Sequence, residues 1–187
     1  MKRLLITLLL VVLFFPPVGS ARSVVDHTVQ SIVRVESLTN AGATSTCTGF
    51  MVAPRRALTA VHCVPLDASL TVDGEVSVVI KGDESFALLL AGDKPVLKLG
   101  TKLRVQEAVT SFGYAWGRGI IALSRRVSAI DEGDFAVDGP LAPGMSGGPT
   151  VNRNGDVVGL NQASNEIIGI ACGAGEMREF LANPFRP

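Results

Sequence analysis

A serine set among glycines and a histidine beside a cysteine are the features of this 187-residue chain best suited to chemistry. Ser146 lies in the segment 143–149, PGMSGGP, and His62 lies in the segment 59–63, TAVHC. A serine hydroxyl attacks an acyl carbon when a neighbouring base takes its proton and N–H groups stabilise the oxyanion that forms. Histidine is such a base, and glycines permit backbone dihedrals at which N–H groups converge. Together the two segments indicate acyl transfer.

The order of the two residues distinguishes three scaffolds on which this chemistry occurs. Residues 144–148 spell G-x-S-x-G, the turn that holds the nucleophile of α/β-hydrolases such as lipases and esterases, but there the histidine follows the serine. Both histidines of this chain, His27 and His62, precede Ser146. Subtilisin has the order Asp, His, Ser, which Asp26, His62 and Ser146 would fit. Its parallel α/β sheet, however, is opposed by the alternating, strand-rich pattern and short length of this chain. Histidine before serine on a β scaffold remains.

The elements that must position these residues are mainly short strands. Apolar residues alternate or form short runs rich in β-branched side chains, which predicts strands. Such runs occur at 31–35, 49–52, 58–60, 75–80, 86–90, 105–112, 120–123, 156–160 and 167–171. Only 60–63 and 176–182 are expected to be helical. The pattern predicts an all-β barrel or sandwich, and its interruption at 90–95 marks the expected boundary between two lobes.

The N-terminus has the pattern of a secretory signal peptide. Lys2 and Arg3 precede an apolar run at 4–15, which is followed by prolines and small residues. The run is shorter than the roughly 20 residues that a membrane-spanning helix needs, so we expect removal of residues 1–20 and no stable membrane anchor. The mature protein is then secreted or periplasmic. Without Lys2 and Arg3 the basic residues are outnumbered by the 17 acidic ones, which argues against a nucleic-acid partner.

Two further segments carry a resemblance to a known family. Residues 47–63, CTGFMVAPRRALTAVHC, resemble the strand, turn and strand that deliver the catalytic histidine in trypsin-like serine proteases. Residues 154–161, NGDVVGLN, and 168–171, IGIA, are similar to the bacterial HtrA-type branch. The resemblance covers most of residues 30–182. It implies a chymotrypsin-like double β-barrel with a short C-terminal helix, spanning residues 21–187, with the junction of the two lobes near 91–104.

The resemblance also implies a function and the residues that perform it. Ser146 would attack a peptide bond of a polypeptide substrate, with His62 as general base and then general acid. The backbone N–H groups of Gly144 and Ser146 would form the oxyanion hole. No cofactor or metal is implied, and the sequence contains no His/Cys/Asp cluster with the spacing of metal ligands.

The cysteines fit an exported protein of this family. The resemblance implies a disulfide between Cys47 and Cys63, directly beside His62, and an oxidising compartment would allow it to form. Closing a loop of that size contributes about 3 kcal/mol in the chain-entropy model. Cys172 is left unpaired, and we expect it to be buried as a small apolar residue.

Residues for substrate binding also follow from the resemblance. Pro140 and Leu141 would form the floor of the pocket for the residue before the scissile bond. Gln162, Ala163 and Ser164 would form a strand edge that pairs with an extended peptide. We expect no buried charged residue in this pocket. A substrate with Lys or Arg before the scissile bond is therefore not expected to be preferred.

The sequence departs from the family where the aspartate of the catalytic triad should stand. The family's D-x-A-L-L stretch reads SFALL at 85–89, so Ser85 replaces the aspartate. Losing that carboxylate from an intact site costs about 10⁴ in kcat. Asp83, two residues earlier on the same strand face, is one candidate replacement and is our third catalytic residue. Glu84, or the uncharged hydroxyl of Ser85 itself, remain open alternatives.

A second departure lies beside the nucleophile. Met145 stands where digestive proteases place an aspartate and the HtrA type usually has asparagine. Methionine cannot pair with a freed amino terminus, so that route of activation is not implied. Together with Ser85, this departure supports a competing hypothesis: a catalytically inactive protein of the protease fold that binds peptides or proteins.

Overall fold

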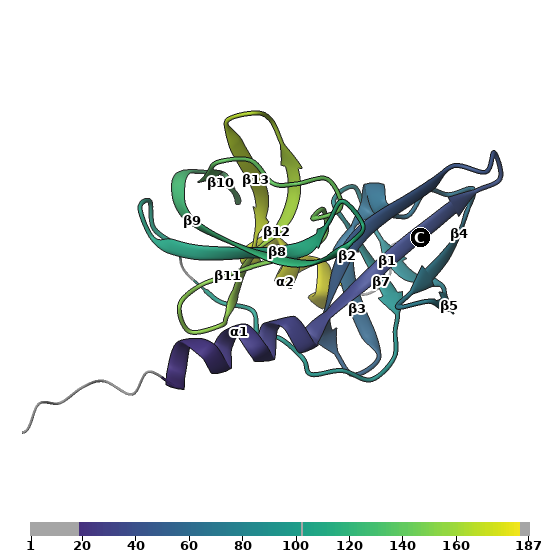
Figure 1. Cartoon of the computed structure of the whole chain (residues 1–187), viewed down its shortest axis with the longest axis horizontal. Helices are drawn as coiled ribbons and strands as arrows, with labels where there is room; N and C mark the ends of the chain where they lie inside the picture. The colour runs from purple at the N-terminus through teal and green to yellow at the C-terminus, as the bar shows by residue number, and fades with distance from the viewer. Residues whose placement is uncertain (1–18, 102, 184–187) are drawn as a thin grey trace, which may run out of the picture.

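The structure, a computed structural model, describes residues 19–101 and 103–183. Residues 1–18, which carry most of the expected signal peptide, lie outside this range. No helix within the described ranges is long and apolar enough to cross a membrane. The described chain forms two β lobes, shown at the right and left of Figure 1.

The first lobe is a curled antiparallel sheet of seven strands in the order β5-β4-β1-β2-β3-β7-β6. Its strands are β1 (Ile32–Thr39), β2 (Thr44–Ala53), β3 (Arg56–Ala60), β4 (Ala68–Val72), β5 (Glu75–Ser77), β6 (Val79–Gly82) and β7 (Phe86–Leu90). The edge strands β5 and β6 follow each other through the single residue Val78. The chain therefore switches there from pairing with β4 to pairing with β7, which curls the sheet.

The second lobe is a closed barrel in the order β10-β13-β12-β11-β8-β9. Its strands are β8 (Ala108–Ala115), β9 (Gly119–Asp131), β10 (Asp134–Asp138), β11 (Pro149–Val151), β12 (Val157–Ser164) and β13 (Ile168–Gly173). A closed barrel and a curled sheet, followed by a short helix, confirm the predicted all-β fold class. Only the second lobe is a fully closed barrel.

The two lobes share one apolar core. Phe50 and Leu58 of the first lobe and Phe112 and Leu160 of the second are fully buried in the same cluster. Strand β2 is buried at residues 47–51, where it contacts both the neighbouring strands of its own sheet and β8. Residues placed on β2 can therefore contact both lobes.

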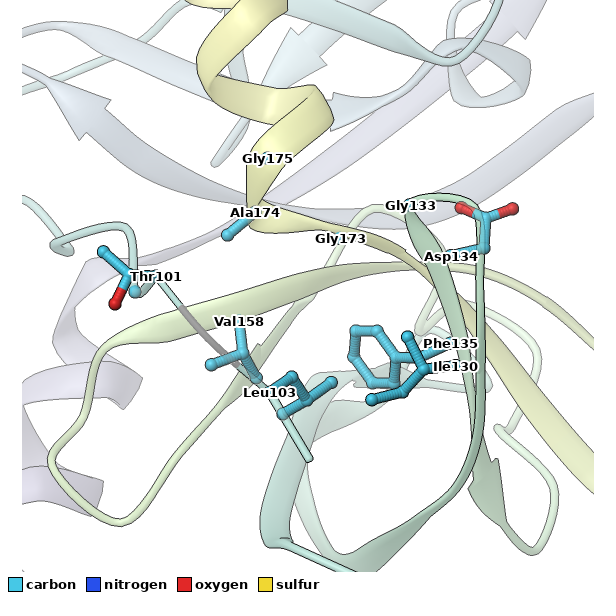
Figure 2. A pocket seen from close by; sticks show the side chains of 11 residues that line it. Thr101, Leu103, Ile130, Gly133, Asp134, Phe135, Val158, Gly173, Ala174 and Gly175 are labelled. Carbon is cyan, nitrogen blue, oxygen red and sulfur yellow. The ribbon is translucent and has the colours of Figure 1, made fainter. Parts of the chain in front are cut away.

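Two of the three helices among the described residues lie where the sequence predicted helical structure. The 3₁₀ turn η1 (Val61–Cys63) carries His62, and α2 (Ala174–Ala182) ends the described chain. Helix α2 returns to the first lobe, where the ring centroid of Phe180 lies 5.5 Å from that of Phe86. The ammonium of Lys81 lies 4.4 Å from the Phe180 ring centroid and donates to the carbonyl of Asn183 at 2.6 Å. A small pocket of about 150 Å³ opens where α2 begins (Figure 2).

Helix α1 (Gly19–Ser31) was not predicted, and the expectation of only two helical segments was wrong. The hydroxyls of Thr28 and Ser31, both fully buried, donate to the carbonyls of residues four positions earlier, each at 2.8 Å. Val24 packs against Gly155 in the second lobe, consistent with the place of α1 in Figure 1. Because part of the buried face is polar, the apolar spacing that reveals a helix is absent. His27 is exposed on this helix.

Candidate active site

Ser146 lies in a loop, residues 142–148, whose backbone requires glycine. Gly144 has a φ of +92° and Gly147 a φ of +79°, values that other residues rarely adopt. A Cβ atom on Gly144 would lie 2.2 Å from the carbonyl oxygen of Tyr114, and one on Gly147 would lie 2.2 Å from that of Thr48. Both close approaches are to backbone atoms, so the loop follows this path only with glycine at both positions.

The N–H group of Gly144 is held in place but has no partner. Its peptide carbonyl, that of Pro143, accepts a 2.6 Å hydrogen bond from the backbone N–H of Trp116. The C=O and N–H of a trans peptide point in opposite directions, so fixing the carbonyl also fixes the N–H. Within the described residues that N–H donates no hydrogen bond.

The N–H group of Ser146 is set in the same way. The carbonyl of Met145 accepts hydrogen bonds from the Gly148 N–H at 3.0 Å and from the side-chain amide of Asn161 at 3.3 Å. The amide of Asn161 is itself oriented by Thr150, whose hydroxyl donates to its oxygen at 2.7 Å. The Ser146 N–H likewise has no partner among the described residues. The serine and the glycine two residues before it therefore each present a free N–H donor, as an oxyanion hole requires.

His62 lies in η1, against the disulfide. Cys47 and Cys63 are bonded, with Cα atoms 5.9 Å apart, which confirms the predicted pairing. A ring nitrogen of His62 lies within 4.8 Å of both sulfur atoms. His62 is exposed, but the protein around the imidazole partly desolvates it, and its pKa lies below the ordinary value of 6.5 because desolvation disfavours the charged form.

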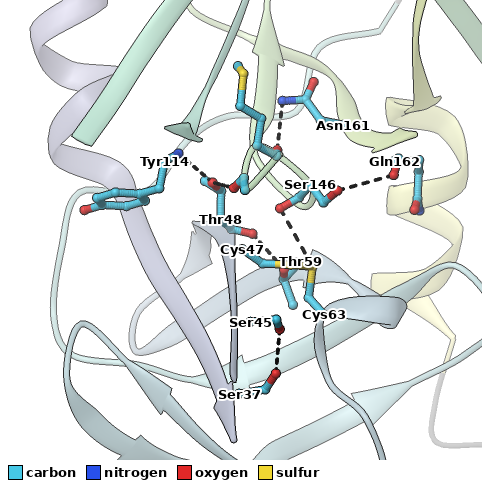
Figure 3. The surroundings of a disulfide bond; sticks show 12 residues. Ser37, Ser45, Cys47, Thr48, Thr59, Cys63, Tyr114, Ser146, Asn161 and Gln162 are labelled. Carbon is cyan, nitrogen blue, oxygen red and sulfur yellow. Dashed lines mark hydrogen bonds between the residues drawn. A yellow bond between two sulfur atoms is a disulfide. The ribbon is translucent and has the colours of Figure 1, made fainter. Parts of the chain in front are cut away.

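The histidine segment and the serine loop meet across the two lobes. The carbonyl of Ser146 accepts a 2.8 Å hydrogen bond from the Thr48 N–H and lies 3.8 Å from the sulfur of Cys63. Figure 3 shows Ser146 between Cys63 and Gln162. The hydroxyl of Ser146 lies 3.5 Å from the Gln162 carbonyl oxygen. Among the residues that the structure describes, no hydrogen bond joins this hydroxyl to His62. In unliganded sites such bonds often form only with substrate.

The carboxylate of Asp83 is engaged in a turn. One of its oxygens accepts hydrogen bonds from the backbone N–H groups of Ser85 at 2.8 Å and Phe86 at 2.7 Å. Asp83 also lines a groove of about 590 Å³ on the first lobe whose lining does not include Ser146. In residues 19–101 and 103–183, no hydrogen bond or ion pair joins His62 to a carboxylate, and none contributes to its pKa. Glu84 is exposed.

A pocket of about 430 Å³ adjoins Ser146. Its lining includes Leu141, Ala163 and Ser164, three of the five residues predicted to bind substrate. Pro140 does not line this pocket; it is exposed, and its carbonyl accepts a 2.9 Å hydrogen bond from Arg125. The lining also includes the exposed carboxylate of Glu166, which the sequence reasoning did not single out.

Gln162, the fifth predicted substrate-binding residue, uses its side chain elsewhere. Its amide nitrogen donates a 2.9 Å hydrogen bond to the carbonyl of Ser85 in the first lobe. Only its backbone carbonyl faces the serine hydroxyl. Nothing in the sequence pattern indicated that the side chain of Gln162 would bond to the first lobe rather than face the substrate.

Met145 is fully buried in an apolar cluster with Ala115 and Leu141, against which Ile121 and Leu123 pack. The position that carries a polar side chain in the family is thus held here by apolar packing. This contact anchors the loop without an ion pair.

Two groups of side chains have the proximity of metal ligands. The sulfur atoms near His62 belong to the disulfide and are not thiolates. Elsewhere the thiol of Cys172 lies within 4.8 Å of carboxylate oxygens of Asp134 and Glu176. Burial and the neighbouring Asp134 raise the pKa of this thiol to about 12, so it stays protonated at neutral pH. Cys172 is buried, as predicted, although beside two carboxylates rather than in wholly apolar surroundings.

Comparisons with known proteins agree with this geometry. The family model of the trypsin-like peptidase domain matches residues 47–160. Protease Do-like 2, a chloroplastic protein of Arabidopsis thaliana, is 30% identical over 143 residues, which are 63% of this chain but only 23% of that protein.

Solved structures share the fold at lower identity. The Rv3671c protease from M. tuberculosis, in its active form, has a TM-score of 0.78 and 23% identity, covering 91% of this chain and 88% of that one. The HtrA-type protease AlgW, solved with a tripeptide, has a TM-score of 0.76 and 20% identity, covering 87% and 62%. The predicted resemblance to the trypsin-like family is confirmed by the family model, and this chain shares its fold with the HtrA-type protease AlgW.

Proposed function

This chain belongs to the trypsin-like peptidase family, and we propose that it is an exported serine endopeptidase whose nucleophile is Ser146. The observation that carries this proposal is the pair of fixed, unpartnered N–H groups on Gly144 and Ser146. The two groups belong to Ser146 and to the glycine two residues before it, and Ser146 borders a pocket and lies against the histidine segment. Such donors have no structural use in the described chain, but they stabilise an oxyanion.

The residues act in two half-reactions. His62 takes the hydroxyl proton as Ser146 attacks the peptide carbonyl, and the N–H groups of Gly144 and Ser146 bind the oxyanion. His62 then gives the proton to the leaving amine, and the acyl-enzyme remains. Water, deprotonated by His62, attacks the ester; the bond from the acyl carbon to the Ser146 oxygen breaks, His62 returns the proton to that oxygen, and the acid leaves. Every proton moves through the one imidazole, and no metal or cofactor is required.

We propose that His62 works without a carboxylate partner. One carboxylate oxygen of Asp83 is bonded in the turn at 83–86, no hydrogen bond in the described chain joins Asp83 to His62, and Ser85 offers no charge. The imidazole then gains no electrostatic stabilisation when it becomes charged, so turnover should be slow for this family.

The substrate we propose is an extended polypeptide. Ala163 and Ser164 lie at the end of β12 and line the pocket beside Ser146, where a peptide strand can pair. Leu141 closes the same pocket. The signal-like N-terminus and the disulfide support export to an oxidising compartment.

Labelling with a fluorophosphonate probe tests the function. The wild-type protein should be labelled, and Ser146→Ala and His62→Ala should each abolish labelling while their circular dichroism stays unchanged. The exposed Ser69, in β4, provides a matched control, because Ser69→Ala removes a serine away from the site. Labelling that persists in the Ser146→Ala protein would refute the assignment.

A second candidate function is peptide binding without catalysis. It is favoured by the missing carboxylate at His62 and by the absence of a His62–Ser146 hydrogen bond within the described structure. In that case the wild-type protein would bind peptides but would not react with the probe.

A further inference from the structure

We propose that Thr48 is a positioning residue that holds the oxyanion loop, residues 142–148, in its competent shape; this rests on the function proposed above. Thr48 stands on β2 of the first lobe and is fully buried. Thr48 does not itself line the pocket beside Ser146 and, in our mechanism, does not contact the substrate. Its effect on the reaction would pass entirely through the loop.

The hydroxyl of Thr48 joins two segments of the second lobe. It accepts a 2.8 Å hydrogen bond from the backbone N–H of Tyr114 and donates one of 2.7 Å to the carbonyl of Gly144 (Figure 3). The backbone N–H of Thr48 donates to the carbonyl of Ser146 at 2.8 Å. One residue thus holds the carbonyls of both proposed oxyanion-hole residues.

Space around Thr48 is provided by glycines. A Cβ atom on Gly113 would lie 2.9 Å from the Thr48 hydroxyl oxygen, and one on Gly148 would lie 3.1 Å from its methyl group. One on Gly147 would lie 2.2 Å from its carbonyl oxygen. Three glycines from two segments therefore admit this one side chain and its backbone.

The hydrogen bond to Gly144 completes the restraint of that residue. Trp116 fixes the peptide before Gly144, and Thr48 fixes the peptide after it. With both peptide planes held, the Gly144 N–H cannot turn away from the oxyanion position, even though glycine has wide conformational freedom. The Met145 side chain supplies only apolar packing, and the Thr48 hydroxyl adds to the polar restraints that Trp116 and Asn161 place on the loop.

Isosteric variants separate this role from simple packing. Thr48→Val keeps the shape and removes the hydroxyl, whereas Thr48→Ser keeps the hydroxyl. Ser37→Ala is the matched control, because the hydroxyl of Ser37 is also buried and bonds to that of Ser45 at 2.7 Å, within the first lobe. For each protein we would measure kcat, KM, inhibition by a peptide boronic acid that forms a tetrahedral adduct, and amide hydrogen exchange of residues 142–148.

The expected result is specific to the oxyanion loop. Removing an oxyanion donor outright costs about 10²–10³ in kcat, so loosening one should cost at least about tenfold. Thr48→Val should lower kcat and boronate affinity by such a factor, with little change in KM. It should also speed exchange at Met145, Gly147 and Gly148, the loop residues whose N–H groups are hydrogen-bonded. Thr48→Ser and Ser37→Ala should behave like the wild type.

Other outcomes overturn the inference. If Thr48→Val retains kcat and loop protection, or if Thr48→Ser loses as much as Thr48→Val, the hydroxyl does not position the loop. A wild-type protein with no turnover would refute the proposed function instead. The exchange comparison would then still decide whether Thr48 holds the loop.

Discussion

The side-chain amide of Gln162 and the backbone carbonyl of Ser85 are joined by a 2.9 Å hydrogen bond across the two lobes. The same carbonyl accepts a 3.0 Å hydrogen bond from Val61, the residue before His62. Ser85 occupies the position of the family's triad aspartate, and here its backbone carbonyl joins two segments by hydrogen bonds. It links the histidine segment to the second lobe but gives the imidazole no charge.

Restoring the missing charge should raise activity. Ser85→Asp places a carboxylate at the family's position, and we expect kcat/KM to increase, by up to the roughly 10⁴ that the carboxylate is worth in intact triads. Asp83→Asn keeps the oxygen that accepts the turn hydrogen bonds, so we expect it to change kcat/KM by less than about tenfold. Steady-state kinetics on a peptide substrate measure both. A fall approaching 10⁴ in Asp83→Asn would instead identify Asp83 as the orienting carboxylate.

The pH dependence should report the unpaired histidine. His62 must be neutral to act as base, so activity is present above its pKa and is lost as the pH falls through it. Because burial lowers that pKa, the acid limb of kcat/KM should have its midpoint below pH 6.5. The limb should move to higher pH in Ser85→Asp, since a nearby carboxylate favours the charged imidazole. A wild-type midpoint above 6.5 would show that a carboxylate already faces His62.

Gly144→Ala should disable the oxyanion loop. The added methyl group would lie 2.2 Å from the carbonyl oxygen of Tyr114 at a φ of +92°, so the loop must move. We expect kcat to fall by at least about 10², the cost of one lost oxyanion donor. Gly119→Ala is the matched control, because a Cβ there meets nothing within 4 Å and the φ is not positive. Unchanged kcat in Gly144→Ala would exclude its N–H from the mechanism.

Met145 should tolerate an apolar replacement but not a charge. The side chain is fully buried, so Met145→Asp would bury a carboxylate without a partner and lower the free energy of unfolding by at least about 3 kcal/mol. Met145→Leu, of similar volume, should lower it by less than about 1.5 kcal/mol. Urea titrations followed by fluorescence measure both values. Equal stability of the two variants would mean that the loop does not depend on this apolar contact.

Removing the disulfide should lower the free energy of unfolding of the protein. The bond joins cysteines 16 residues apart, and a loop of that size is worth about 3 kcal/mol. The double variant Cys47→Ala/Cys63→Ala should lose about this much free energy of unfolding. Adding a reductant to the Cys172→Ala protein, which keeps the disulfide, should reproduce the loss. If the reductant leaves the urea midpoint unchanged, the disulfide contributes little.

The sequence by itself determined those features that depend on local pattern and chain order. Strands follow from period-two alternation, which opposes the parallel α/β sheet of subtilisin. The positions of His62 and Ser146 exclude the α/β-hydrolase arrangement because residue order is fixed along the chain. The pairing of Cys47 with Cys63 followed from resemblance and is confirmed. The glycines around Ser146 predicted unusual backbone dihedrals, but the close approaches of Gly144 to Tyr114 and of Gly147 to Thr48 are known only from the structure.

The tertiary structure alone decided which partners those residues meet. Thr48 lies 96 positions before Gly144, and Gln162 lies 77 positions after Ser85, so no local pattern records either hydrogen bond. Helix α1 escaped prediction because its buried face includes hydroxyls bonded within the helix itself. Asp83 lies on the expected segment, and the structure shows that one oxygen of its carboxylate accepts two hydrogen bonds of a turn. Contacts of this kind depend on how two lobes pack and on which acceptor a side chain reaches first, and only the folded chain brings those groups together.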